Sequence, residues 1–202
     1  MSADQPPPAF ATSKLETAVV LAGQEFGRLY HGRYPDPLGF GKTRSRFSDP
    51  RRRINENRFG VLYLGQSLKV CFLEAILRDL RNGSVGDFPL NESELHTRQF
   101  ARIGIERDLV LVDLRGDALV RMGIPSDVAR GARQTLARYW SVAFYEHPES
   151  PDGIIYHSRL NGETNLAIYD RAVGKMRTID TVPLIAAPGL ASVLAAFRVA
   201  LV

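Results

Sequence analysis

Cysteine is nearly absent from this chain of 202 residues, which contains Cys71 alone. A single cysteine excludes a disulfide framework within the chain and is typical of proteins from reducing compartments. We therefore expect a cytoplasmic protein. The neighbours Val70 and Phe72 supply no charge that would lower the pKa of this thiol, which favours a structural role over a nucleophilic one.

Long apolar segments are also missing. No apolar run approaches the roughly 20 residues that a membrane-spanning helix needs, so we expect no membrane association. Residues 1–8 are polar and rich in proline, without a basic stretch that leads into an apolar one, which argues against a signal peptide. We interpret residues 1–12 as a flexible lead and residues 13–202 as a single domain.

The sequence lacks the short motifs of metal and dinucleotide cofactor sites. His31 and His157 have no partners at metal-ligand spacing, and neither CxxC nor HExxH occurs. The segment Gly39-Phe40-Gly41-Lys42-Thr43 lacks the first glycine of a phosphate loop, and no GxGxxG motif opens a helix. We expect neither a metal nor a resident cofactor.

Composition places the chain among soluble globular proteins, with 45% apolar and 24% charged residues. The length suits one well-buried domain. The net charge of +4 and the pI of about 9.4 suit anionic ligands. Basic residues are scattered, apart from Arg51, Arg52 and Arg53, so we expect no direct binding of nucleic acid.

Residue patterns predict helices over residues 13–25, 68–81, 117–122, 126–144 and 191–201. They predict strands around residues 28–30, 60–64, 96–105, 109–114, 152–159, 164–169 and 177–184. Ser67 and Ser126 are the expected N-caps of two of these helices. Because helices and strands are mixed without regular β-α-β alternation, we expect an α+β domain with a mixed, mainly antiparallel sheet and flanking helices.

Two loops stand out. Residues 32–58 are rich in Pro, Gly and Arg, and a loop of this length in a compact domain is usually functional or disordered. The second is the turn of the expected hairpin. The apolar strand before this turn ends with His157, Ser158 and Arg159, which brings a hydroxyl and a cation to the edge of the sheet. The alternative is an ordinary hairpin with a polar end.

Glu74 is a carboxylate on an otherwise apolar helix face that it shares with Val70 and Leu77. A carboxylate in such a place must be paired or must look into a cleft. Arg78, one turn further on, is the obvious partner. Both interpretations stay open at this point.

Two arginines and two tyrosines are candidate ligand-binding residues. The planar guanidinium groups of Arg28 and Arg46 suit phosphate, although solvation, or a pair of Arg46 with Asp49, would also explain them. Tyr30 and Tyr63 offer stacking faces with a polar tip, although core packing is equally consistent with their place in strands.

Taken in order, these pieces resemble the RES domain, named for its Arg, Glu and Ser. The matching segments are F-G-R-L-Y-H-G, S-R-F-S-D-P, G-V-L-Y-L-G-Q-S with the helix of Glu74, and D-G-I-I-Y-H-S-R followed by N-L-A-I-Y. They span roughly residues 26–169, with Tyr63 eleven residues before Glu74. Residues 51–59 look like added sequence and 82–94 look long, which leaves the role of Arg46 open.

The resemblance implies a fold similar to ADP-ribosyltransferases and a toxin that consumes NAD+ by cleaving the nicotinamide–ribose bond, by hydrolysis or phosphorolysis. It implies a cognate Xre-like antitoxin, self-association, and NAD+ as substrate rather than cofactor. An alternative within the family is a mono-ADP-ribosyltransferase that modifies a protein. A third hypothesis, from another class, is a non-catalytic module that uses the Arg-rich loop at 44–58 to bind an acidic partner or nucleic acid.

The resemblance also implies roles for individual residues. Glu74 would stabilise positive charge on the ribose carbon, and Ser158 would hydrogen-bond the nicotinamide amide or a ribose hydroxyl. Arg28, with Arg46 as a second candidate, would hold the pyrophosphate side, and Tyr30 and Tyr63 would border the pocket. The expected catalytic residues are thus Glu74, Arg28 and Ser158, with Arg46, Tyr30 and Tyr63 as substrate-binding residues.

Overall fold

The computed structural model describes residues 5–51, 57–78, 80, 83 and 85–202. An eight-stranded sheet with the order β1-β6-β7-β8-β3-β2-β5-β9 forms its centre. Neighbouring strands are antiparallel except β6 and β7, which are parallel. The strands are β1 (Thr17–Val20), β2 (Glu25–His31), β3 (Val61–Gly65), β5 (Arg98–Ile105), β6 (Leu109–Asp113), β7 (Gly153–His157), β8 (Thr164–Tyr169) and β9 (Met176–Pro183). The predicted α+β class with a mixed, mainly antiparallel sheet is confirmed.

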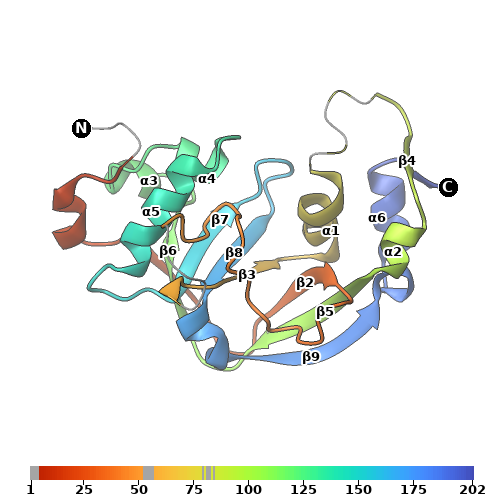
Figure 1. Cartoon of the computed structure of the whole chain (residues 1–202), viewed down its shortest axis with the longest axis horizontal. Helices are drawn as coiled ribbons and strands as arrows, with labels where there is room; N and C mark the ends of the chain where they lie inside the picture. Colours follow the sequence, from red (N-terminus) through yellow and green to blue (C-terminus); the bar gives the residue numbers. More distant parts are fainter. Residues whose placement is uncertain (1–4, 52–56, 79, 81–82, 84) are drawn as a thin grey trace.

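The sheet is curled, and the two halves that meet at β3 and β2 run in different directions (Figure 1). Apolar side chains from both halves pack into one shared cluster. It includes Leu62 and Leu64 of β3, Ile103 of β5 and Ile168 of β8, all at most 2% exposed. The inner face of the curl is therefore largely a core.

Two groups of helices cover the outer face (Figure 1). The first group is α3 (Ala118–Arg121), α4 (Asp127–Arg130) and α5 (Thr135–Tyr145). Trp140 and Phe144 of α5 pack on Ile154 and Tyr169 of the sheet. The second is α1 (Leu68–Phe72), α2 (Ser93–His96) and α6 (Leu190–Ala196). Short helical turns complete the chain, namely η1 (Pro8–Thr12), η3 (Leu73–Leu77), η4 (Asp170–Lys175) and η5 (Leu184–Ala186).

The helix that carries Glu74 begins as the sequence predicts, because the Ser67 hydroxyl accepts a hydrogen bond from the Val70 backbone N–H. From Leu73 to Leu77 the same helix continues as a π-helical turn, η3. It lies close to the sheet at Gly27 and Gly65, which pair across β2 and β3. A Cβ atom on Gly65 would lie 2.7 Å from the Cys71 sulfur, so these glycines set how closely the helix approaches.

The helix predicted over residues 13–25 is wrong. Residues 17–20 form β1 and pair with β6, and β2 already begins at Glu25. Val20 is buried while Val19 is 54% exposed, which is the two-residue period of a strand and suits β-branched residues. Within the expected lead, residues 8–12 form η1, whose Phe10 is buried against Trp140 and Phe144.

Three further predictions need correction. The helix expected over 126–144 splits into α4 and α5, because Gly131 adopts an extended conformation, and the Ser126 side chain makes no cap hydrogen bond. The closing helix ends at Ala196. Residues 199–201 form β10 (Val199–Leu201), which pairs in parallel with β4 (Phe88–Leu90), a strand that the residue patterns did not predict. Pairing between distant segments decided these ends.

None of the helices in these described ranges is long and apolar enough to cross a membrane.

Candidate active site

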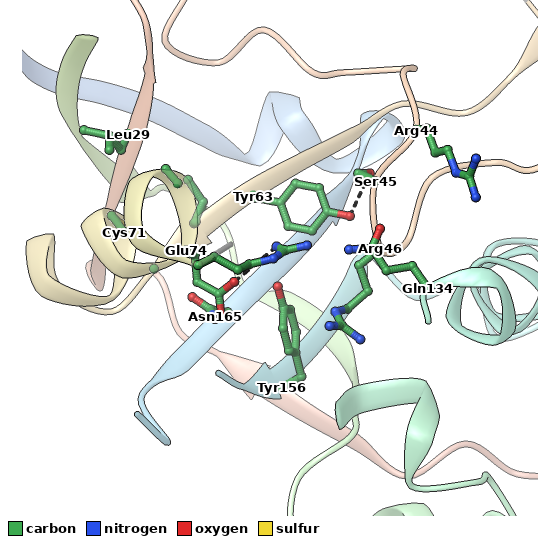
Figure 2. A pocket seen from close by; sticks show the side chains of 14 residues that line it. Leu29, Arg44, Ser45, Arg46, Tyr63, Cys71, Glu74, Gln134, Tyr156 and Asn165 are labelled. Atoms are coloured by element: carbon green, nitrogen blue, oxygen red, sulfur yellow. Dashed lines mark hydrogen bonds and ion pairs between the residues drawn. The ribbon is translucent and has the colours of Figure 1, made fainter. Parts of the chain in front are cut away.

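A cavity of about 290 Å³ opens on the outer face of the sheet, between the two groups of helices. Its walls come from residues 44–46, from β3, from α1 with η3, and from β7 and β8 (Figure 2). Four charged side chains line it: Arg44, Arg46, Glu74 and Arg78. The cavity thus collects one carboxylate and three guanidinium groups from segments far apart in the sequence.

Glu74 reaches this cavity from the π-helical turn. It is paired with Arg78 and also faces the cavity, so the two interpretations from the sequence are both correct. Its Oε2 accepts a hydrogen bond from Arg78 Nη1 at 3.3 Å, and its Oε1 accepts one from Ser158 Oγ at 2.7 Å. Asn165 Nδ2 lies 3.5 Å from the same Oε1. Single π-helical turns are frequent at functional sites. The carboxylate is therefore fixed in position while its side chain remains 22% exposed toward the cavity.

Ser158 lies behind Glu74 rather than in the cavity wall. The residue is 3% exposed, and its hydroxyl also accepts a hydrogen bond from the Leu160 backbone N–H at 3.2 Å. It borders a separate, open cavity of about 510 Å³ together with His157 and Arg159. The structure therefore brings Ser158 to Glu74 as expected, but its hydroxyl bonds the carboxylate.

Arg46 and Tyr63, two of the expected substrate-binding residues, both line the cavity. Arg46 is 6% exposed, and its Nη1 donates to the Gly131 carbonyl at 2.9 Å. Burial lowers the pKa of its guanidinium, and the nearby charges of Arg78 and Arg159 act in the same direction. The Tyr63 hydroxyl lies 3.0 Å from Ser45 Oγ and accepts from the Phe47 N–H at 2.9 Å, so it holds the segment that carries Arg46.

Arg28 and Tyr30 do not join this group. Leu29 lines the cavity, and alternation along β2 places its two neighbours on the opposite face. Arg28 donates to the carbonyls of Pro37 and Gly39, and burial lowers its pKa to about 10. Tyr30 is 8% exposed and packs in the core cluster inside the curl. The expectation that Arg28 lies beside Glu74 and Ser158 needs correction, because the strand turns its side chain to the far face.

Sequence reasoning missed Tyr156 and Asn165. These residues lie directly opposite each other in β7 and β8, and both line the cavity. Tyr156 is two residues before Ser158, so strand alternation could have placed it on the same face. Arg78, treated only as a partner of Glu74, also lines the cavity. Arg44 and Ser45 lie in the loop at 32–58 that the sequence singled out only as a whole, and nothing in the sequence pointed to Gln134.

Burial shifts the pKa values of several residues that line the cavity. Burial raises the pKa of Tyr156 well above its ordinary value, and it also raises that of Tyr63. Burial raises the pKa of the Cys71 thiol to about 12, which agrees with a structural thiol. A search of the described residues finds no group of three His, Cys, Asp or Glu side chains that could hold a metal ion. Residues 52–56 of the Arg-rich loop lie outside the described residues.

The arrangement fits a polar organic ligand that develops positive charge near Glu74 and carries negative charge near the arginines. A model of the RES domain matches residues 25–187. The chain belongs to the RES domain family. This match runs from the start of β2 to the end of η5 and includes every residue that lines the cavity.

Two known proteins resemble this RES domain. A probable toxin, y4kH, from Sinorhizobium fredii is 46% identical over 109 residues, which cover 54% of this chain and 86% of that protein. The crystal structure of the M. tuberculosis MbcT–MbcA toxin–antitoxin complex contains a chain with the same fold, with a TM-score of 0.63 and 16% identity. That match covers 89% of this chain and 91% of the other.

Proposed function

We propose that this RES domain is the toxin of a toxin–antitoxin pair and that it cleaves the bond between nicotinamide and ribose in NAD+. Support for the toxin role comes from the family match and from the relative that is itself named a probable toxin. Support for the chemistry comes from Glu74, which lines the cavity. Its carboxylate accepts hydrogen bonds from Ser158, Asn165 and Arg78.

The reaction needs little acid catalysis, because nicotinamide leaves as a neutral molecule. The ribose carbon gains oxocarbenium character as the bond breaks, as in glycoside hydrolysis. A fixed carboxylate beside that carbon stabilises the charge, and the partial exclusion of water strengthens the effect. Glu74 has this role in the proposal, and Ser158, Arg78 and Asn165 keep its oxygens in place.

Arg46 replaces Arg28 as the cavity's candidate for binding the phosphate side of the substrate. Its one hydrogen bond within the described part of the chain goes to a backbone carbonyl, which leaves further N–H donors for a ligand. Tyr63 and Tyr156 border the same space and offer faces for the nicotinamide or ribose ring.

The test is to incubate the purified protein with NAD+ and to follow free nicotinamide, with and without inorganic phosphate. We expect release by the natural sequence and a loss of at least about a hundredfold in Glu74→Gln, since the charge that stabilises the transition state is removed. Glu94→Gln is the matched control and should keep full activity, because Glu94 is an exposed residue of α2 that pairs with Arg98 away from the cavity. No release under either condition contradicts the proposal.

The acceptor of the ADP-ribosyl group distinguishes the members of this reaction class. Hydrolysis gives ADP-ribose, phosphorolysis gives a phosphorylated ADP-ribose, and transfer places label from NAD+ on a protein. Product analysis in the same assay separates them. The cavity serves all three reactions, because they share the step at the ribose carbon.

We also propose a cognate antitoxin, of Xre-like type, as the partner of this chain. The solved structure with the same fold is a toxin–antitoxin complex. Expression of the toxin alone should stop growth, and co-expression of its cognate antitoxin should restore it. Size-exclusion chromatography of the co-expressed pair would show the complex and the self-association that the family resemblance implies.

A further inference from the structure

We propose that a second cavity, next to the first, is a phosphate-binding subsite that holds the diphosphate of the ligand. This cavity has a volume of about 350 Å³ and is lined by Lys42, Arg44, Arg58 and Arg138. The identity of the ligand as a dinucleotide rests on the proposed function. The binding of a phosphate group at these residues rests on the structure alone.

Arg44 lines both cavities, so the two sites adjoin. Figure 2 shows its guanidinium directed away from Glu74 and Tyr63, on the far side of Ser45. A ligand whose reacting ribose lies beside Glu74 would therefore meet Arg46 and then Arg44 as it extends outward. In a dinucleotide, the diphosphate follows directly after that ribose.

The second cavity carries a large excess of positive charge. Among the described residues that line it, four are cationic and one, Asp49, is a carboxylate that is already engaged. Asp49 accepts hydrogen bonds from Arg51 Nε at 2.9 Å and from Arg51 Nη2 at 2.7 Å. Although burial disfavours its charge, these bonds hold the pKa of Asp49 below its ordinary value. The carboxylate therefore does not neutralise the cations around the cavity.

Arg138 is the most unusual of these cations. It is only 6% exposed, and its one side-chain hydrogen bond in the described chain joins Nη2 to Thr135 Oγ1 at 3.2 Å. Burial and the charge of Arg44 both lower the pKa of its guanidinium. Buried charges are normally paired. Arg138 also lies in the first turns of α5, where the helix dipole already favours an anion over a cation.

A phosphate group would correct this imbalance. Guanidinium groups donate parallel hydrogen bonds to phosphate oxygens without losing their charge, and a helix N-terminus adds a favourable dipole. Among the described residues, no side chain makes a cap hydrogen bond at the start of α5. The subsite would thus bind the ligand tightly at a distance from the reacting bond.

The direct test is to titrate inorganic diphosphate into the full chain by calorimetry at low salt. We expect Arg138→Met and Lys42→Met each to raise its dissociation constant about tenfold, since each removes a charged hydrogen-bond donor. Arg177→Met is the matched control. It removes the same charge from an exposed residue of β9 that pairs with Glu106, and it should bind diphosphate as the natural sequence does.

Thermal melts of the three variants identify any that fail to fold, and Lys42→Met decides the test if buried Arg138 cannot be replaced. Absence of diphosphate binding by the natural sequence, or equal binding by all folded variants, would overturn the subsite. This readout needs no catalysis. Binding without NAD+ cleavage would sink the proposed reaction and leave the subsite, and cleavage without binding would do the reverse.

Kinetics provide the second arm. Nicotinamide riboside carries the scissile bond of NAD+ but no phosphate. We expect Lys42→Met to raise KM for NAD+ about tenfold with kcat little changed, and to leave kcat/KM for the riboside as it is. An equal loss on both substrates would show a general structural defect and contradict a phosphate subsite.

Discussion

The Glu74 carboxylate shows how single residues shape this site. Ser158, the helix neighbour Arg78 and the strand residue Asn165 all point donors at its oxygens. Ser158 is a positioning residue in this arrangement, since its hydroxyl touches the carboxylate and is turned away from the cavity wall.

We predict that Ser158→Ala lowers kcat for NAD+ cleavage by at least about tenfold with little change in KM, because Glu74 loses its shortest hydrogen bond. Stability should fall by about 2 kcal/mol, as is usual for one hydrogen bond to a charged group. Ser158→Thr, which retains a hydroxyl, should recover part of kcat. A large rise in KM with unchanged kcat would place Ser158 against the substrate instead.

The two arginines expected to bind the ligand should separate in a direct comparison. Arg46→Met should raise KM for NAD+ strongly, because Arg46 lines the cavity. Arg28→Met should instead destabilise the fold by about 3 kcal/mol, because the carbonyls of Pro37 and Gly39 lose a charged donor. Urea unfolding and steady-state kinetics of both variants check this. If the Arg28→Met variant folded normally but lost activity, Arg28 would again be the residue expected to hold the pyrophosphate side of the substrate.

At the scale of elements, the contact between α1 and the sheet positions Glu74. We predict that Gly65→Ala destabilises the protein by about 2 kcal/mol and lowers activity, because the new Cβ would meet Cys71 Sγ and Val70 Cγ1, both at 2.7 Å. The helix must then move outward and carry the carboxylate with it. Gly174→Ala, where no atom lies within 4 Å of the added Cβ, is the control. Equal effects of both changes would contradict this account.

Elements with strong local signals could be predicted from the sequence. Strand β3, the hairpin of β7 and β8, and the helix capped by Ser67 lie where apolar patterns and turn residues placed them. The π-helical turn at Leu73–Leu77 has no such signal, because it depends on how the helix packs. Strands β1, β4 and β10 were missed for a related reason, since their partners lie far away in sequence.

At the scale of the whole molecule, several carboxyl groups link stability to pH. Burial opposes ionisation of Asp49 and Asp113, but hydrogen bonds from Arg51 and Arg115 outweigh it and hold both pKa values below the ordinary 3.8. The unfolded chain then binds more protons than the folded one in this range. These two groups therefore contribute fully to the free energy of unfolding above about pH 4. Their contribution is lost as the pH falls through their lowered pKa values in the folded protein.

We predict that the free energy of unfolding, measured by urea titration at several pH values, decreases as pH falls below about 4. Asp113→Asn should make this decrease shallower, since it removes one of the groups that take up a proton on unfolding. Glu106→Gln, at an exposed pair with Arg177, is the control. Stability that rises under acid would contradict the lowered pKa values.

The sequence by itself determined the family and the class of fold, because ordered motifs and local patterns of apolar residues survive without knowledge of long-range packing. It also singled out Glu74 and Ser158, since a polar group on an apolar element needs a partner or a ligand, and Arg46 and Tyr63 as ligand-binding residues. Only the tertiary structure decided that Arg28 faces away and that Tyr156 and Asn165 line the cavity with Glu74. The face that a strand presents is set by its register with distant strands and by the curl of the sheet, and no stretch of sequence contains that information alone.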